Sequence, residues 1–157
     1  MHDRLKTIVD LERYPIQDLS SPKIKETIKK CKSDLDKFSC ATIPNFILYK
    51  SLKIMKTELE KQINEVYMSE ESINAYLYSK DDSSLPNDHP KRIFMDRSNG
   101  YLNSDLFEKD SEMKFLYEQE ELLKFVSACL GVSPIYRWAD PLACHAYNVM
   151  KPEGILP

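Results

Sequence analysis

Apolar residues recur at intervals of three or four positions over residues 21–38, with lysines between them. The stripe consists of Ile24, Ile28, Cys31, Leu35 and Phe38. This spacing places the apolar side chains on one face of an α-helix and the lysines on the opposite, solvated face. Ser21 can cap such a helix, and Pro22 suits its first position, where a missing N–H costs nothing. The pattern therefore predicts a helix that begins at Pro22.

Helical spacing returns in three further stretches. Ser51 precedes the second stripe and is expected to cap its helix. That stripe consists of Leu52, Met55, Leu59, Ile63, Val66 and Tyr67. A short helix is predicted over residues 113–117 and a longer one over 122–130. The longer helix should end at Gly131, because glycine readily adopts the left-handed conformation that closes helices, and Pro134 prevents its continuation.

Strand-like runs lie at residues 39–48, 74–78, 135–139 and 144–150. They are rich in the β-branched and aromatic residues that strands favour. Pro44 confines the first run to an edge or an end of a sheet. A turn at Asp140-Pro141 should join the last two runs.

Alternation along the last run divides its side chains between two faces. One face carries Cys144, Ala146, Asn148 and Met150, and the other carries His145, Tyr147 and Val149. Because neighbours on a strand point to opposite faces, Cys144 and His145 are not expected to act as a pair. A single histidine on a strand is more often a core residue than a metal ligand, so we do not assign His145 as a metal ligand.

These elements predict a single domain over residues 1–157, which we expect to be incomplete at its C-terminus. Residues 1–20 read as an arm laid over the core, residues 21–131 as a helix-rich part, and residues 135–157 as the first core strands. A polar, proline-containing stretch predicts a long loop at 79–103, and loops of that length are usually functional or mobile.

Composition narrows the class of protein. The 157-residue chain has a net charge of −3, which argues against a nucleic-acid binder, and only 3 glycines, which argues against glycine-rich phosphate loops. No apolar run approaches the roughly 18 residues of a membrane span. The four cysteines form no C-x-x-C pair and match no zinc template, so we expect reduced thiols in a cytoplasmic protein.

Arginine is distributed unevenly. The chain has 5 Arg against 17 Lys, yet Arg92 and Arg97 both fall in the predicted loop. Where lysine is the usual cation, a local arginine pair suggests bidentate recognition of a carboxylate. The alternative is a pair of surface ion bridges to Asp96 or Asp88.

Four segments together carry a resemblance to a known family. They read Ala-Thr-Ile-Pro-Asn-Phe (41–46), Ala-Cys-Leu-Gly (128–131), Tyr-Arg-Trp-Ala-Asp-Pro-Leu-Ala (136–143) and Tyr-Asn-Val-Met-Lys-Pro-Glu-Gly (147–154). In this order they resemble the N-terminal part of an Fe(II)/2-oxoglutarate-dependent oxygenase, of the branch that hydroxylates or halogenates amino acids and similar metabolites. The resemblance runs from about residue 8 onward, and its most specific part is 128–157.

The resemblance implies an α+β fold in which N-terminal helices pack on the first strands of an incomplete double-stranded β-helix, or jelly roll. It places the family's His-x-Asp motif, or His-x-Gly or His-x-Ala in halogenases, just past Pro157. No residue of this chain matches the metal ligands, so the chain is expected to be inactive alone and not to bind Fe(II) or 2-oxoglutarate tightly.

The resemblance also suggests contacts for a small-molecule substrate or cosubstrate. Arg92 would contact a carboxylate and Asp140 an ammonium group. Asn148 would bind 2-oxoglutarate or substrate if its face of the strand looks inward, and Tyr147 if the opposite face does. The alternative for both is core packing. Trp138 either lines the pocket or packs in the core.

Two other classes of protein remain open. The chain could be a complete, non-catalytic α+β interaction module that binds through residues 79–103, since no metal-ligand pair occurs in it. A metal-dependent isomerase of the cupin type ranks last, because the Gly-rich His-x-His motif is missing.

Overall fold

The computed structural model describes residues 2–140, 142 and 144–150. Its α-helices are α1 (His2–Ile8), α2 (Pro22–Phe38), α3 (Tyr49–Lys61), α4 (Glu112–Tyr117) and α5 (Glu120–Leu130). Short 3-10 helices are η1 (Ile63–Glu65), η2 (Pro90–Arg92) and η3 (Ser104–Leu106). The strands are β1 (Tyr67–Asn74), β2 (Phe94–Asn103) and β3 (Ala146–Val149). The turn predicted at Asp140-Pro141 and the segment 151–157 fall partly or wholly outside the described residues.

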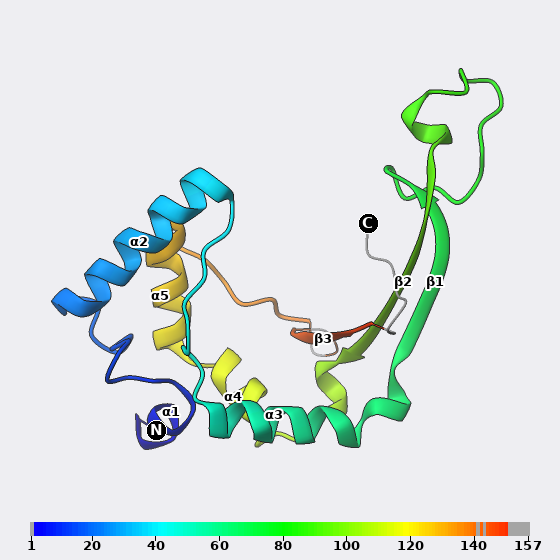
Figure 1. The fold of residues 1–157 in the computed structure, drawn as a ribbon. Helices are drawn as coiled ribbons and strands as arrows, with labels where there is room; N and C mark the ends of the chain where they lie inside the picture. The colour runs from blue at the N-terminus through cyan, green and yellow to red at the C-terminus, as the bar shows by residue number, and fades with distance from the viewer. Residues whose placement is uncertain (1, 141, 143, 151–157) are drawn as a thin grey trace.

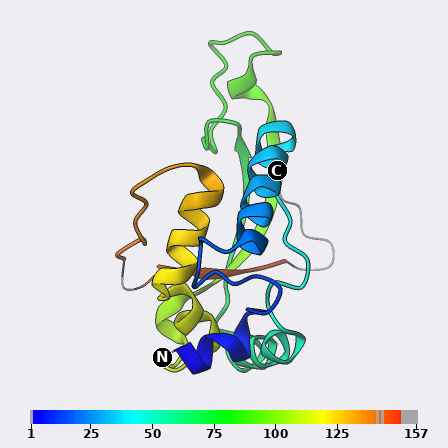
Figure 2. The same cartoon turned by 90° about the vertical axis from the view of Figure 1, so that its left-hand side faces the viewer.

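Helices and sheet occupy opposite sides of the molecule, which is therefore α+β, as predicted (Figure 1). The helix α3 runs along the base from the helical side to the long β1–β2 ribbon, and β3 crosses between the two sides. Seen from the helical side, α2 and α5 stand next to each other in front of the sheet, and they are in contact (Figure 2).

The main hydrophobic core lies on the helical side. Its buried members are Leu5, Ile8, Val9, Tyr14, Ile16, Ile24, Cys31, Met55, Leu116, Phe125 and Cys129. The first five belong to residues 1–20, which the sequence predicts as an arm laid over a core. This segment instead contains α1 and supplies part of the core itself.

The strand predicted over residues 39–48 is wrong. Among the described residues its sheet-like pairing is one isolated bridge, between Val9 and Ile47, and the chain turns at Asn45, whose φ is 57°. Aromatic packing and a hydrogen bond hold it instead. The Tyr14 hydroxyl donates to the Pro44 carbonyl over 2.7 Å, and the Phe46 ring stacks on Phe125 with centroids 5.8 Å apart.

The predicted start of α2 at Pro22 is confirmed, whereas α3 begins at Tyr49 rather than after a Ser51 cap. Ser51 is buried inside α3, and its hydroxyl donates to the Thr7 carbonyl over 2.9 Å. The serine therefore fastens α3 to α1. The predicted stripe of this helix also stops early, since α3 ends at Lys61 and Tyr67 opens β1.

The sheet is antiparallel with strand order β1-β2-β3. The β1–β2 ribbon pairs along its whole length, from Tyr67 opposite Tyr101 to Asn74 opposite Phe94. Strand β3 pairs with the last four residues of β2 only, and it is an edge strand of the described sheet.

Gly100 lies where all three strands meet, opposite Met68 on one side and Val149 on the other. A Cβ at this position would stand 2.6 Å from the Met68 sulfur and 3.0 Å from the Val149 carbonyl oxygen. Any other residue here would have to displace the Met68 and Val66 side chains and press on the Val149 backbone, so this crowding favours glycine. The sequence predicts a loop at Gly100, and that prediction is wrong.

The predicted loop over 79–103 is shorter than expected, because β2 occupies residues 94–103. The strand predicted at 74–78 is also wrong, since β1 ends at Asn74. The Asn74 side chain accepts hydrogen bonds from the backbone N–H groups of Tyr76 and Tyr78 over 2.9 and 3.1 Å. A side chain that binds its own backbone a few residues on favours a turn over a strand.

The predicted helices over 113–117 and 122–130 are confirmed as α4 and α5, and Gly131 closes α5 with a φ of 70°. Residues 135–139 form no strand, although their composition predicts one. Trp138 is 68% exposed, so its predicted alternative role in the core is wrong. The last predicted strand is confirmed over Ala146–Val149.

The accessible surface is large for the mass of the chain. It measures 11040 Å² for 18.3 kDa, against about 8,100 Å² for a typical folded monomer of that mass. Many large apolar side chains are correspondingly exposed, Trp138, Tyr136 and Met150 among them. Among the helices of the described residues, none combines the length and the apolar character needed to cross a membrane.

Candidate functional site

A polar cluster lies where β3 passes over α3, η3 and α4. It consists of Glu58, Ser104, Glu112, Lys114, Cys144, His145 and Tyr147, and we call it the β3 cluster. Residues from four distant parts of the chain meet here, because β3 pairs with the end of β2 directly before η3.

Ser104 is fully buried and organises one end of the β3 cluster. Its hydroxyl donates to the Leu142 carbonyl over 2.9 Å and accepts from the Cys144 thiol over 3.2 Å. The Cys144 sulfur also lies 3.4 Å from Nδ1 of His145. The sequence predicts that these two neighbours point apart, and that prediction is wrong: both residues precede β3, so strand alternation does not govern them.

His145 is enclosed by aromatic rings. The Tyr117 ring lies 5.5 Å from it and the Phe107 ring 6.5 Å, measured between centroids. Its Nε2 atom is buried and has no hydrogen-bond partner among the described residues. Burial lowers the pKa of His145 below its ordinary value of 6.5, and the Lys114 ammonium lowers it further. The imidazole is therefore neutral at pH 7, with one nitrogen able to accept a proton.

Tyr147 occupies the face of β3 that looks toward the protein. Along β3, Ala146 and Asn148 are exposed while Tyr147 and Val149 are half-buried. The Tyr147 ring packs on Phe107 with centroids 5.0 Å apart, and its buried hydroxyl has no partner among the described residues. Burial, together with the Glu58 carboxylate, raises the pKa of Tyr147 to about 12. The phenol therefore remains a neutral hydrogen-bond donor.

Two carboxyl groups complete the β3 cluster. Glu58 accepts a hydrogen bond from the Glu112 backbone N–H over 3.2 Å, and each glutamate has one buried oxygen without a partner in the described structure. Burial is the main cause that raises the pKa of Glu58, and the Glu112 charge raises it further. The β3 cluster thus combines a neutral imidazole, a neutral phenol and a carboxyl that protonates readily.

The other residues predicted from the sequence lie elsewhere. Asn148 is on the exposed face of β3, and the Asp140 carboxylate accepts from the Leu142 N–H over 2.8 Å. Arg92 lies at the far end of the β1–β2 ribbon, in η2. Of the four predicted contact residues, the structure brings only Tyr147 into the β3 cluster.

Arg92 is bound within its own loop. Its Nε and Nη2 atoms donate to both Asp81 carboxylate oxygens over 2.8 Å each, and Nη1 donates to the Leu85 carbonyl and to Asn87. This ion bridge is to Asp81 rather than to the Asp96 or Asp88 that the sequence suggests. Arg97 instead donates to the Tyr101 hydroxyl over 3.1 Å, so the two arginines do not form one site.

No pattern in the sequence marks Glu58, Ser104 or Glu112 as residues of a site. Glu58 is one of several charged residues on an amphipathic helix, and nothing in its spacing separates it from solvated neighbours. Comparison of the chain with protein-family models, with curated proteins and with solved structures finds no match.

Proposed function

We propose that this chain is the N-terminal part of an Fe(II)/2-oxoglutarate-dependent oxygenase that hydroxylates or halogenates a small polar metabolite, such as an amino acid, in the cytoplasm. The proposal rests on the segments at 41–46, 128–131, 136–143 and 147–154 that resemble that family. In it, β3 is an early strand of a jelly roll, and the helices form its outer layer.

The position of Tyr147 is the observation that carries this proposal furthest. The resemblance makes either Tyr147 or Asn148 the contact to 2-oxoglutarate or substrate, depending on which face looks inward. Tyr147 is on the half-buried face, and its hydroxyl is neutral and without a partner among the described residues. Such a hydroxyl suits a role as donor to a carboxylate oxygen.

The exposed surface supports the same proposal. In the part of the chain that the structure describes, β3 is an edge strand, and the accessible area is about a third above that of a typical monomer. Both features are what a sheet awaiting further strands would show. The strands that follow in a jelly roll would cover Trp138, Tyr136 and Met150.

The described residues themselves do not form an iron site. Nowhere among them do three His, Cys, Asp or Glu side chains gather closely enough to hold a metal ion. The proposal therefore assigns no iron chemistry to these residues. Their part is to bind and orient a cosubstrate or substrate at the β3 cluster and to shield it from water.

The coding sequence beyond the codon for Pro157 provides the first test. We expect a His-x-Asp, His-x-Gly or His-x-Ala motif within a few residues, followed much later by a His…Arg pair. Protein made from the whole reading frame should form succinate from 2-oxoglutarate only when Fe(II) is added. Absence of the motif, or of iron-dependent succinate, overturns the proposal.

One observation favours a non-catalytic interaction module as the second candidate. The ribbon tip exposes Tyr76, Leu77, Tyr78 and Ile93, each by more than half. Such a patch is typical of a protein-binding surface. A complete module should unfold in one cooperative thermal transition, whereas an open jelly roll should aggregate on heating through its free strand edge.

A further inference from the structure

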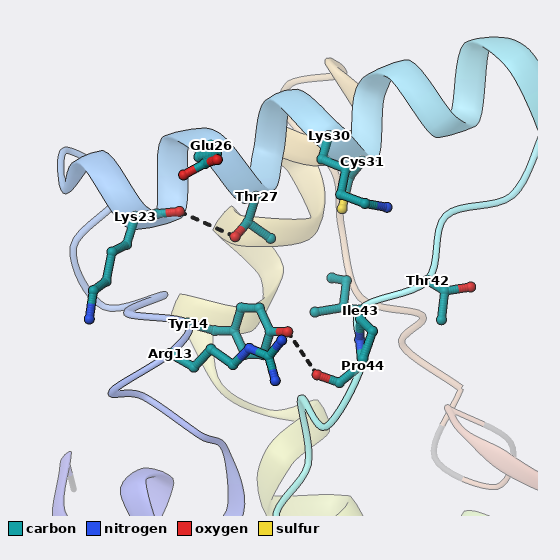
Figure 3. Close-up of a pocket in the computed structure, with 10 residues that line it drawn as sticks. All are labelled: Arg13, Tyr14, Lys23, Glu26, Thr27, Lys30, Cys31, Thr42, Ile43 and Pro44. Atoms are coloured by element: carbon teal, nitrogen blue, oxygen red, sulfur yellow. Dashed lines mark hydrogen bonds between the residues drawn. The ribbon is translucent and has the colours of Figure 1, made fainter.

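A pocket on the far side of the helical core shares no residue with the β3 cluster. It has a volume of about 650 Å³, which lies in the range of small-molecule sites. Arg13, Tyr14, the inner side of α2 and residues 42–44 line it (Figure 3). These are the segments whose packing replaces the strand that the sequence predicts at 39–48.

The floor of this pocket is apolar and firmly built. Tyr14 is 5% exposed and is anchored by its hydrogen bond to the Pro44 carbonyl. Ile43 and Cys31 complete the floor, and Cys31 is itself buried against the core. Apart from the Tyr14 ring face that Arg13 covers, these side chains present apolar surface, so the floor suits an apolar body.

The rim of the pocket is positively charged. Arg13, Lys23 and Lys30 stand around the opening, against one carboxylate, Glu26. Figure 3 shows Lys23 and Lys30 at opposite ends of the α2 side, with the Arg13 guanidinium below, beside the Tyr14 ring. This local excess of positive charge occurs on a chain whose net charge is −3.

The three cations differ in how far they are already paired. Lys30 forms an ion pair with Asp34 on the next turn of α2, and Lys23 donates to the Glu12 carbonyl over 3.2 Å. Arg13 packs its guanidinium 5.4 Å above the Tyr14 ring and forms no ion pair in the part of the chain that the structure describes. The Arg13 guanidinium is therefore free to form a bidentate pair of hydrogen bonds with a carboxylate or phosphate in the pocket.

We propose that this pocket binds an amphipathic organic anion, whose apolar body lies on Tyr14, Ile43 and Pro44 and whose anionic head meets Arg13 and Lys23. Binding here is independent of the oxygenase proposal and of the β3 cluster. Both parts of the ligand contribute to binding. Its apolar body loses contact with water on the floor of the pocket, and its anionic head is selected by the positive charges of the rim.

The test uses 1-anilinonaphthalene-8-sulfonate, an anionic aromatic probe, and N-phenyl-1-naphthylamine, which has the same apolar body without the charge. Titration followed by fluorescence should show one saturable site for the anionic probe and weaker binding of the neutral one. Amide shifts in NMR spectra should change at Thr27, Thr42 and Ile43. Added salt should weaken binding of the anionic probe only, because it screens the rim charges.

Variants locate the charge recognition. Arg13→Gln and Lys23→Gln should each weaken binding of the anionic probe by about three- to tenfold, as expected for loss of one exposed charge-assisted contact. Lys29→Gln is the matched control, since Lys29 lies on the same helix but does not line the pocket. Equal binding of both probes, equal effects of all three variants, or shifts confined to other residues would overturn the proposal.

Discussion

The Tyr117 hydroxyl and the Trp138 backbone bind each other twice. The hydroxyl accepts from the Trp138 N–H over 2.9 Å and donates to the Trp138 carbonyl over 3.4 Å. These two hydrogen bonds hold the irregular segment 135–139, which follows α5, against the end of α4. The same tyrosine packs against His145, so one side chain holds both the approach to β3 and the imidazole of the β3 cluster.

Tyr117→Phe should remove both hydrogen bonds and leave the ring packing intact. We expect a loss of about 1 kcal/mol of unfolding free energy. Hydrogen exchange at the Trp138 amide should become faster than in the wild type. Tyr136→Phe is the control, because Tyr136 is 82% exposed, and it should change neither quantity. Unchanged exchange at Trp138 in Tyr117→Phe would show that the hydrogen bonds do not hold the segment.

Gly100→Ala should destabilise the sheet where β2 pairs with both β1 and β3. The added methyl group would meet the Met68 sulfur, Val66 Cγ1 and the Val149 carbonyl oxygen at 3.0 Å or less. The Met68 chain can move aside, but the Val149 backbone can do so only by weakening the β2–β3 pairing. We expect a loss of about 1–3 kcal/mol in denaturant unfolding. Ser98→Ala, further along β2, should be nearly neutral.

Arg92→Lys should loosen the loop between β1 and β2, because lysine cannot reproduce the two-pronged bond to Asp81. Limited proteolysis should cut the loop faster, and Asp81→Asn should have a similar effect although it leaves Arg92 charged. The two variants separate the structural role of Arg92 from its predicted contact with a substrate carboxylate. If the proposed oxygenase uses Arg92 to bind substrate, Arg92→Lys should raise its KM more than Asp81→Asn does.

His145 should make the protein less stable as the pH falls. Because burial depresses its pKa, the folded protein takes up a proton at lower pH than the unfolded chain does. Its contribution is therefore present above pH 6.5 and is lost as the pH falls through the lower, folded pKa. His145→Asn should flatten that part of a curve of unfolding free energy against pH. Lys114→Gln should flatten it in part, since the Lys114 charge adds to the shift. Identical curves for all three proteins would contradict this account.

Elements fixed by their own local backbone were predictable from the sequence. Pro22 starts α2 and Gly131 ends α5 because each acts on the helix end where it stands. The prediction that Ser51 caps a helix failed because the hydrogen-bond partner of Ser51, the Thr7 carbonyl, is distant in sequence. The sequence predicts a loop where β2 lies because a polar, proline-containing stretch precedes it, and the strands that pair with β2 come from other parts of the chain.

The candidate site was predictable only in outline. Alternation correctly set Tyr147 and Asn148 on opposite faces, but the choice of the inner face depends on Phe107, which packs on Tyr147 from outside the strand. Glu58 and Ser104 entered the β3 cluster through tertiary packing alone. The aromatic run 135–139 failed as a strand because no neighbouring strand lies beside it in the described structure.

The order of strands in the sheet also sets a sequence of events in folding. Strands β1 and β2 follow each other in the chain and can pair as soon as both exist. Strand β3 comes only after η3, α4 and α5, and therefore pairs across a long, entropically costly loop. During synthesis the edge of β2 that pairs with β3 stays open at least until β3 has been made, after the residues of α4 and α5. For that interval, the end of β2 at Gly100–Asn103 is the place where a nascent chain would pair wrongly with another copy of itself.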